Sequence, residues 1–269
     1  MPEGPEVRTT TDFLSTFIGK DVKSFTVLSG RYTKKGGIPN ASNVNLPATI
    51  KTVNCKGKFI YFTFRNKGTD CHLFSTLGMT GMWTNIKTKH SRVVFVFNDE
   101  SNLYYNDVRN FGTLKFVDSD SDLEKKLKSL GPDVLTDEIN TELFISRFNS
   151  KLNKTIAECL MNQSVISGVG NYLKAEILYA SRISPNRKVS EINKAEWNNL
   201  CFNTLEITKK SYNLGGATIE SYRQPNGKEG LYSRRFAVYN QKTDPLGNNV
   251  IKEQTLDKRT THWVPNIQK

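Results

Sequence analysis

The sequence contains few of the residues that hold metal ions or form disulfides. Its 269 residues include four cysteines and three histidines, which are scattered along the chain: Cys55, Cys71, Cys159, Cys201, His72, His90 and His262. No pair of the cysteines has the spacing of metal ligands, and nothing in their pattern indicates a disulfide framework. They are typical of reduced, mostly buried thiols in an intracellular protein. We therefore expect no metal site and no cofactor.

Long apolar segments are also missing. No apolar run approaches the roughly 18 residues that a membrane-spanning helix needs, and the N-terminus lacks the apolar core of a signal peptide. The chain has no internal repeat and no low-complexity tract. We expect an intracellular protein without a membrane-spanning segment, and nuclear, cytoplasmic and viral settings all remain open.

Positive charge is in excess. Lys and Arg together number 38 against 26 Asp and Glu, which gives a net charge of +12. Such an excess suits a polyanionic partner, nucleic acid first and an acidic membrane second. Because the positive residues are spread along the chain, an ordinary basic protein without such a partner is the alternative.

The two halves of the chain have different patterns. Before about residue 119, seven short segments have strand-forming composition: 25–28, 50–53, 59–64, 71–77, 92–97, 103–105 and 113–117. So many short strands in series predict an antiparallel sandwich or barrel. Beyond residue 119 apolar residues recur at helical spacing, with helix N-caps predicted at Asn171 and, in a capping box with Glu196, at Asn193. Two more strands are predicted at 236–239 and 260–264, so the fold class is α+β.

The first seven residues, MPEGPEV, carry the most specific chemistry. The initiator methionine is usually trimmed before so small a residue as proline, which would leave Pro2 with a free secondary amine. An α-amino group has a pKa of about 7.7–8.0, so roughly a tenth of it is neutral and nucleophilic at pH 7. Its condensation with a sugar aldehyde gives an iminium cation, the electron sink that backbone cleavage by elimination requires. Glu3 can carry protons, although the alternative is that Glu3 and Pro5 simply start a helix.

Three further motifs have both a structural and a functional interpretation. Lys58 ends a tight Lys-Gly-Lys turn, where an ordinary exposed lysine is the alternative. Met79 lies on a turn between two glycines, and Arg109 and Phe111 lie in a second loop. By residue type, core packing is the structural interpretation of Met79 and Phe111. The Gly-Val-Gly-Asn sequence ending at Asn171 lets the backbone approach an anion at a helix N-terminus, or is a plain turn between helices.

Together these motifs resemble the formamidopyrimidine-DNA glycosylase/endonuclease VIII family over nearly the whole chain. The resemblance implies that Pro2 is the nucleophile, Glu3 the acid/base and Lys58 a catalytic lysine beside the lesion phosphate. It also implies DNA contacts by six further residues: Met79, Arg109, Phe111, Lys154, Asn171 and Arg259. The first three would refill the gap left when a damaged base leaves the stack. Residues 215–230 resemble the loop that covers the lesion. The sequence departs from the bacterial motifs at Asn110, where a second arginine is usual, and at Thr76, which takes the place of a histidine.

The C-terminal segment departs most from bacterial relatives, which end in a four-cysteine zinc finger. Residues 236–269 contain no cysteine, so no finger of that type can form. The basic hairpin pattern around Arg259 remains and resembles the zincless finger of endonuclease VIII-like glycosylases; a solvated basic tail is the alternative. We predict an N-terminal antiparallel β-sandwich domain (1–130), a linker (131–145), and a helix–two-turn–helix domain (146–269) whose zincless-finger β-hairpin occupies about 236–269.

The predicted function is that of a bifunctional DNA glycosylase/AP lyase of base excision repair. It would remove oxidised pyrimidines and ring-opened purines through a Schiff base on Pro2 and cut the strand by β,δ-elimination. Its expected partner is damaged double-stranded DNA, with single-stranded DNA left open, and we expect a monomer. Two alternatives are a non-catalytic nucleic-acid binder of the same fold and a helix–two-turn–helix protein of the translation or topology machinery. The second would not explain a chain whose mature form begins with proline.

Overall fold

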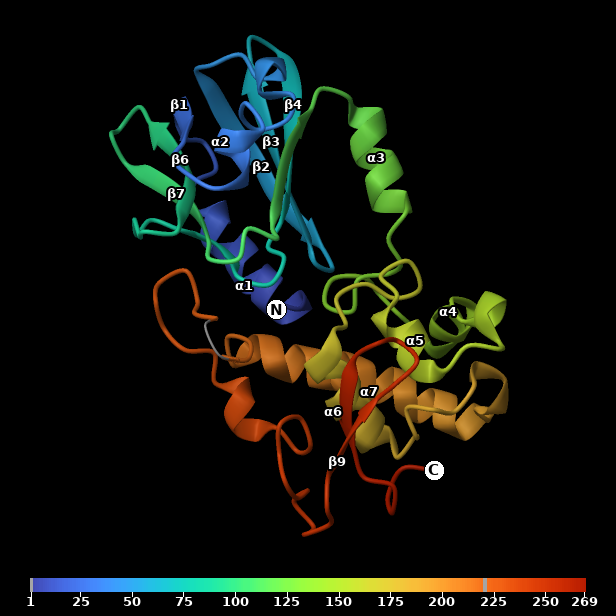
Figure 1. Cartoon of the computed structure of the whole chain (residues 1–269). Helices are drawn as coiled ribbons and strands as arrows, with labels where there is room; N and C mark the ends of the chain where they lie inside the picture. Colours follow the sequence, from blue (N-terminus) through green and yellow to red (C-terminus); the bar gives the residue numbers. More distant parts are fainter. Residues whose placement is uncertain (1, 220–221) are drawn as a thin grey trace. The chain divides into compact units, whose positions relative to one another are not determined.

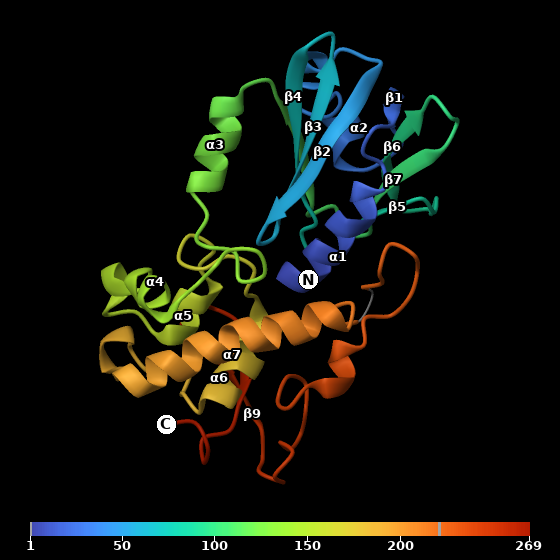
Figure 2. The same ribbon diagram turned by 180° about the vertical axis from the view of Figure 1, so that it is seen from behind.

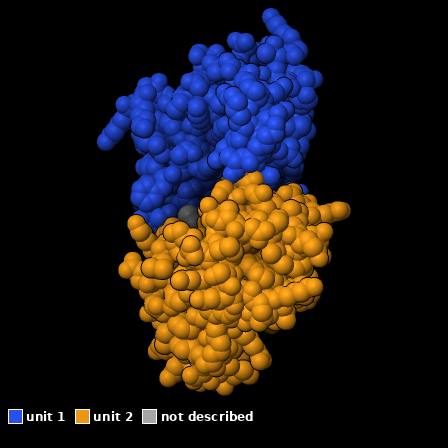
Figure 3. All heavy atoms as spheres, turned by 90° about the vertical axis from the view of Figure 1, so that its right-hand side faces the viewer, with its two compact units in different colours: residues 1–2, 6–129, 218–230 blue, residues 3–5, 130–217, 231–269 orange. Residues whose placement is uncertain are grey.

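The computed structural model describes residues 2–219 and 222–269 (Figure 1). Contacts within the chain divide it into two compact units, which Figure 3 shows in two colours. Unit 1 comprises residues 1–2, 6–129 and 218–230, and unit 2 comprises residues 3–5, 130–217 and 231–269. Each unit thus gathers segments that are distant in sequence. The boundaries predicted at residues 130 and 145 remain predictions.

Unit 1 is built on one antiparallel sheet of eight strands in the order β5-β7-β6-β1-β2-β3-β4-β8. The strands are β1 (Asp21–Val27), β2 (Ala48–Lys56), β3 (Phe59–Asn66), β4 (Thr69–Thr76), β5 (Gly81–Thr84), β6 (Ser91–Phe97), β7 (Asn102–Asp107) and β8 (Thr113–Val117). All seven predicted segments fall on strands. Strand β5 was not predicted, because its four residues are too few to show an alternating pattern.

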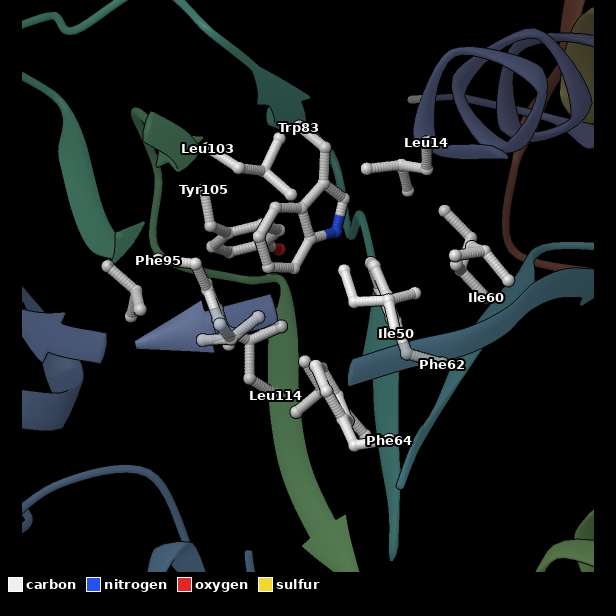
Figure 4. Packing of buried hydrophobic residues seen from close by; sticks show 14 of the residues in the cluster. Leu14, Ile50, Ile60, Phe62, Phe64, Trp83, Phe95, Leu103, Tyr105 and Leu114 are labelled. Carbon is white, nitrogen blue, oxygen red and sulfur yellow. The ribbon is translucent and has the colours of Figure 1, made fainter. Parts of the chain in front are cut away.

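The sheet folds over itself into a sandwich. The ring of Phe62 on β3 lies 5.3 Å from that of Trp83 on β5, and Phe64 on β3 lies 6.3 Å from Phe95 on β6. Since β3 and β6 are three places apart in the sheet, a flat sheet would separate them by about 14 Å. These fully buried rings form the core in Figure 4, and each contributes about 1.5–3 kcal/mol by burial. The predicted antiparallel sandwich is confirmed.

Short helices complete unit 1. Most of α1 (Gly4–Ser15) belongs to it, and Val7 and Leu14, seven residues apart, share the helix face that enters the core. The other helices are α2 (Arg31–Lys34), η1 (Ala41–Asn43) and α3 (Asp120–Lys128).

Unit 2 is mainly helical (Figures 1 and 2). It contains α4 (Thr141–Ser146), η2 (Asn149–Lys151), α5 (Ile156–Met161), α6 (Asn171–Ser181), η3 (Val189–Glu191), α7 (Lys194–Asn213), η4 (Tyr232–Arg235), β9 (Ile251–Gln254) and β10 (Thr260–Trp263). Helix α6 is buried on nearly every side and contacts α5, α7 and β10. The predicted capping box between Asn193 and Glu196 is confirmed at the start of α7.

Two local predictions in unit 2 are wrong. Asn171 is the first residue of α6 rather than its cap, and Gly170 occupies the cap position. Residues 236–239 are not a strand: the backbone N–H groups of Ala237, Val238 and Tyr239 donate to the buried Glu176 carboxylate at 2.8–3.0 Å. The hairpin is formed instead by β9 and β10, of which only β10 was predicted.

Within the described ranges, no helix is both long enough and apolar enough to cross a bilayer.

Candidate functional site

Pro2 lies in unit 1, at the wall of a small cavity. The cavity has a volume of about 160 Å³ and is lined by the following residues: Pro2, Met79, Thr80, Gly81, Met82, Thr88, His90, Asn106, Val108, Tyr222 and Arg223. Burial, reinforced by the charge of Glu6, raises the pKa of the Tyr222 phenol, which therefore stays protonated. The lining is mostly apolar with a few polar side chains, which is typical of a site for a small ligand or base.

The next residue, Glu3, belongs to unit 2 and caps helix α6 from 168 residues away in sequence. Its carboxylate accepts hydrogen bonds from the backbone N–H groups of Tyr172 at 2.9 Å and Leu173 at 3.3 Å. Only 2% of Glu3 is exposed. The helix dipole and the free N–H groups of the first turn stabilise a negative charge at this position. The Glu3 carboxylate is thus held in one position.

Glycine at position 170 makes room for this arrangement. A Cβ added to Gly170 would lie 2.2 Å from Cδ of Glu3. Gly4 is held at the same loop, because its N–H donates to the carbonyl of Gly168 at 2.8 Å. The glycines of the Gly-Val-Gly-Asn motif therefore admit the N-terminal segment of the chain.

The two turns between α5 and α6 are organised by Gln163. Its amide nitrogen donates to the carbonyls of Met161 at 3.1 Å and Val169 at 2.9 Å, and its oxygen accepts from the N–H of Gly168 at 3.0 Å. One side chain thus fixes both ends of the loop that receives Glu3.

Met79, Arg109 and Phe111 are brought together on two adjoining loops of unit 1. Met79 is half-buried, whereas Arg109 is exposed and 54% of Phe111 is exposed. The Arg109 guanidinium lies 4.8 Å from the centre of the Phe111 ring. The core-packing alternative therefore does not hold for Phe111. Exposed aromatic and cationic groups of this kind stack on bases and bind phosphates.

Lys58 and Lys154 are not among the residues that line the Pro2 cavity. Lys58 is half-buried in the turn between β2 and β3, where Gly57 has a φ of 57°. Lys154 is exposed at the start of α5, and its ammonium forms an ion pair with Glu158 at 2.9 Å. A phosphate contact by Lys154 would have to compete with this pair.

Asn171 and the β9–β10 hairpin meet in unit 2. The Asn171 side-chain nitrogen donates to the carbonyl of Thr260 at 3.0 Å, next to the exposed Arg259. One helical turn further along α6, the ammonium of Lys174 forms an ion pair with Asp257 at the tip of the hairpin. The two side chains are 0% and 3% exposed. This pair joins the tip of the hairpin to the helix.

Comparison with known proteins decides the family. The chain matches formamidopyrimidine-DNA glycosylase models of the N-terminal domain over residues 1–114, the H2TH domain over residues 130–223 and the C-terminal domain over residues 233–269. The chain belongs to the formamidopyrimidine-DNA glycosylase family. It is a DNA glycosylase with AP lyase activity, an enzyme of base excision repair.

Relatives of this glycosylase match it from end to end. The formamidopyrimidine-DNA glycosylase of Exiguobacterium sp. is 30% identical over 100% of this chain and 99% of its own length, and that of Halalkalibacterium halodurans is 31% identical over 100% of both chains. The crystal structure of MutM (FPG) from Thermus thermophilus has a TM-score of 0.86 at 28% identity, covering 99% of this chain and 98% of that one. A Lactococcus lactis FPG variant in complex with DNA containing Fapy-dG has a TM-score of 0.85 at 26% identity, with full coverage of both chains.

The C-terminal hairpin of this glycosylase does not fit a cysteine-bound zinc ion. Residues 236–269 contain no cysteine, and the described residues contain no group of three or more His, Cys, Asp or Glu that could hold a metal. Both oxygens of buried Asp244 instead accept hydrogen bonds, from the N–H groups of Leu246 and Asn248 and from the Asn248 amide and the Tyr179 hydroxyl, at 2.7–3.1 Å. Apolar packing around Val264 adds to these hydrogen bonds.

Several residues of the glycosylase site were not found from the sequence. Thr80, Tyr222 and Arg223 line the Pro2 cavity, and Lys174 with Asp257 fixes the hairpin. The usable signals were the position of Thr80 beside Met79 and the predicted lesion-covering loop 215–230, which contains Tyr222 and Arg223. Within the predicted lesion-covering loop, Glu220 and Ser221 lie outside the described residues, as does Met1.

Proposed function

We propose that this glycosylase removes oxidised pyrimidines and ring-opened purines through a covalent intermediate on Pro2. The neutral Pro2 amine attacks C1′ of the damaged nucleotide, the bond from C1′ to the base breaks, and an iminium forms as the sugar ring opens. Glu3 carries protons to and from the sugar. The iminium then accepts the electrons of β-elimination at the 3′ side and δ-elimination at the 5′ side. A one-nucleotide gap with phosphates at both ends remains.

One observation carries this proposal: Pro2 lines a cavity and its neighbour Glu3 is fixed at a helix N-terminus. A mobile glutamate or a solvent-facing proline would not support it. The substrate classes are supported by relatives, because solved Lactococcus lactis FPG complexes contain DNA with Fapy-dG and DNA with an oxidised pyrimidine. The start MPEGPE and the missing finger cysteines favour the endonuclease VIII-like branch, for which intact 8-oxoguanine would be a poorer substrate.

The DNA contacts complete the proposal. Met79, Arg109 and Phe111 fill the gap left by the extruded base, and Lys58 contacts the phosphate beside the lesion. Phosphates are held by Asn171, Arg259 and, after release from Glu158, Lys154. The partner is damaged double-stranded DNA bound by an intracellular monomer. Because phosphate contacts release counterions, affinity for DNA should fall steeply with salt.

Trapping with borohydride tests the covalent step. Borohydride reduces the iminium, so a protein–DNA adduct should form on a duplex containing thymine glycol or an abasic site. Pro2→Ala supplies a primary amine, whose imine needs a further proton to become cationic, and we expect at least about tenfold less adduct with duplex affinity within about threefold.

Two results would contradict the proposal. If wild-type protein forms no adduct, covalent catalysis by Pro2 is contradicted. Salt-sensitive DNA binding with no strand cleavage would instead support the non-catalytic binder.

A further inference from the structure

We infer that Asp107, acting through Thr80, is a positioning residue that joins two loops into one rigid wedge for the gap in the duplex. The wedge consists of Met79 on the loop 77–81 and of Arg109 and Phe111 on the loop 107–112. The inference rests on the proposed function of these three side chains. It assigns a role to Asp107, which contacts neither the sugar nor the base in that proposal, and to Thr80, which also lines the Pro2 cavity.

The Asp107 carboxylate bridges the two loops directly. Thr80 Oγ1 donates to one carboxylate oxygen at 2.5 Å, and the backbone N–H of Gly112 donates to the other at 2.8 Å. Asp107 is 1% exposed. An ionised carboxylate is purely an acceptor, so it can receive a donor on each oxygen at once. Hydrogen bonds to a charged acceptor in a buried setting are the stronger kind.

Thr80, on the first loop, also accepts a hydrogen bond from the second loop. While its hydroxyl donates to Asp107, the same oxygen accepts the backbone N–H of Arg109 at 2.9 Å. The residue next to Met79 therefore fixes the backbone of Arg109. A side chain without the hydroxyl would leave the Arg109 N–H and one oxygen of Asp107 without these partners.

The backbones of the two loops also touch. A Cβ on Gly78 would lie 2.6 Å from the backbone nitrogen of Gly112. The far side of the second loop is held by Arg92, which donates to the carbonyls of Asp107 at 2.7 Å and Val108 at 3.3 Å. The backbones of both loops are thus held in place, and the side chains of Arg109 and Phe111 remain exposed. Side chains arranged before binding lose less conformational freedom on entering the duplex.

Paired substrates separate this role from general stabilisation. A gap exists only in a duplex, so the wedge is irrelevant when the same abasic site lies in a single strand. Asp107→Asn replaces one of the two acceptor oxygens by an N–H₂ donor, so either Thr80 or Gly112 loses its acceptor. For this variant we expect roughly tenfold slower single-turnover cleavage of the duplex and less than about twofold change on the single strand. Thr80→Ser keeps the hydroxyl and should match the wild type on both. Thermal unfolding of all three proteins checks that the fold is retained.

Binding gives a second measurement if wild-type protein does not cut the single strand. Asp107→Asn should weaken binding to a duplex with a tetrahydrofuran abasic analogue by roughly tenfold and leave binding to the undamaged duplex unchanged. Equal losses on both substrates, or no loss on either, would overturn the inference. Wild-type protein that cleaves neither substrate would contradict the proposed function instead.

Discussion

The buried ion pair between Lys174 and Asp257 makes a quantitative prediction about the C-terminal hairpin. Asp257→Asn keeps the shape of the side chain but removes its charge, which leaves the Lys174 ammonium buried beside a neutral amide. Both side chains are almost fully buried. Removing one partner of such a pair costs about 3–5 kcal/mol, because the remaining charge is uncompensated. At about 2–4 °C per kcal/mol for a chain of this size, Tm should fall by roughly 6–20 °C.

A second variant separates the ion pair from the other bonds of Asp257. Its other oxygen accepts from Thr255 Oγ1 at 2.6 Å and from the N–H of Arg259 at 3.2 Å, and an asparagine oxygen can keep both. The double variant Lys174→Met with Asp257→Asn removes both charges. Because apolar replacement of a whole buried pair is often neutral, we expect the double variant to recover most of the lost free energy of unfolding.

The pH dependence of the same variant has a defined sign. Burial lowers the pKa of Lys174, and the charge of Asp257 opposes this effect. Without that charge the pKa of Lys174 in the folded state falls further below its unfolded value of about 10.4. Between the two values the unfolded state binds more protons, so the stability of Asp257→Asn should rise with pH. Its deficit should shrink between pH 7 and pH 10.

Thermal and urea unfolding, with duplex affinity as the functional readout, measure these effects. Duplex affinity should fall with Asp257→Asn, since Arg259 lies in the hairpin that the pair attaches to α6. The reasoning is refuted if Asp257→Asn unfolds within about 1 kcal/mol of the wild type, or if the double variant is less stable than the single one.

The strands of unit 1 could be predicted from the sequence because their signal is local. β-branched and aromatic residues are concentrated in β2, β3 and β6, and each such segment needs only its own residues to be recognised. The same composition at residues 236–239 led to a wrong strand prediction. The backbone N–H groups of residues 237–239 donate to the carboxylate of Glu176 and not to a neighbouring strand. No local pattern records a partner 61–63 residues away.

The start of α6 illustrates the same limit in the candidate site. Asn193 has a glutamate three residues later and is a true cap, whereas three residues after Asn171 stands Lys174. The side chain that accepts the N–H groups at the start of α6 is Glu3, from the N-terminal segment of the chain. The sequence therefore indicated two separate motifs: the N-terminal segment with Pro2 and Glu3, and the glycine-rich turn. Their assembly, and the roles of Thr80 and Asp107 between the loops, depend on contacts between distant segments.

Two further substitutions test individual contacts. Glu196→Gln removes a carboxylate whose pKa is lowered first by its hydrogen bond from Arg187 and also by the backbone N–H of Asn193. Because the pKa of Glu196 is lowered in the folded state, its carboxylate stabilises the fold at pH values above its unfolded pKa of about 4.5. This contribution is lost as the pH falls. The wild type should therefore exceed the variant by up to about 1 kcal/mol at pH 7 and by nothing near pH 2 in urea unfolding; a constant difference would contradict this. Gly170→Ala places a methyl group 2.2 Å from Cδ of Glu3. The φ of −130° at residue 170 is accessible to alanine, so the backbone is not strained and the end of the Glu3 side chain has to move. We expect Tm within a few degrees of the wild type but at least about tenfold slower strand cleavage, measured by single-turnover assay on an abasic duplex. Unchanged cleavage would show that Glu3 does not need the position it has at the N-terminus of α6.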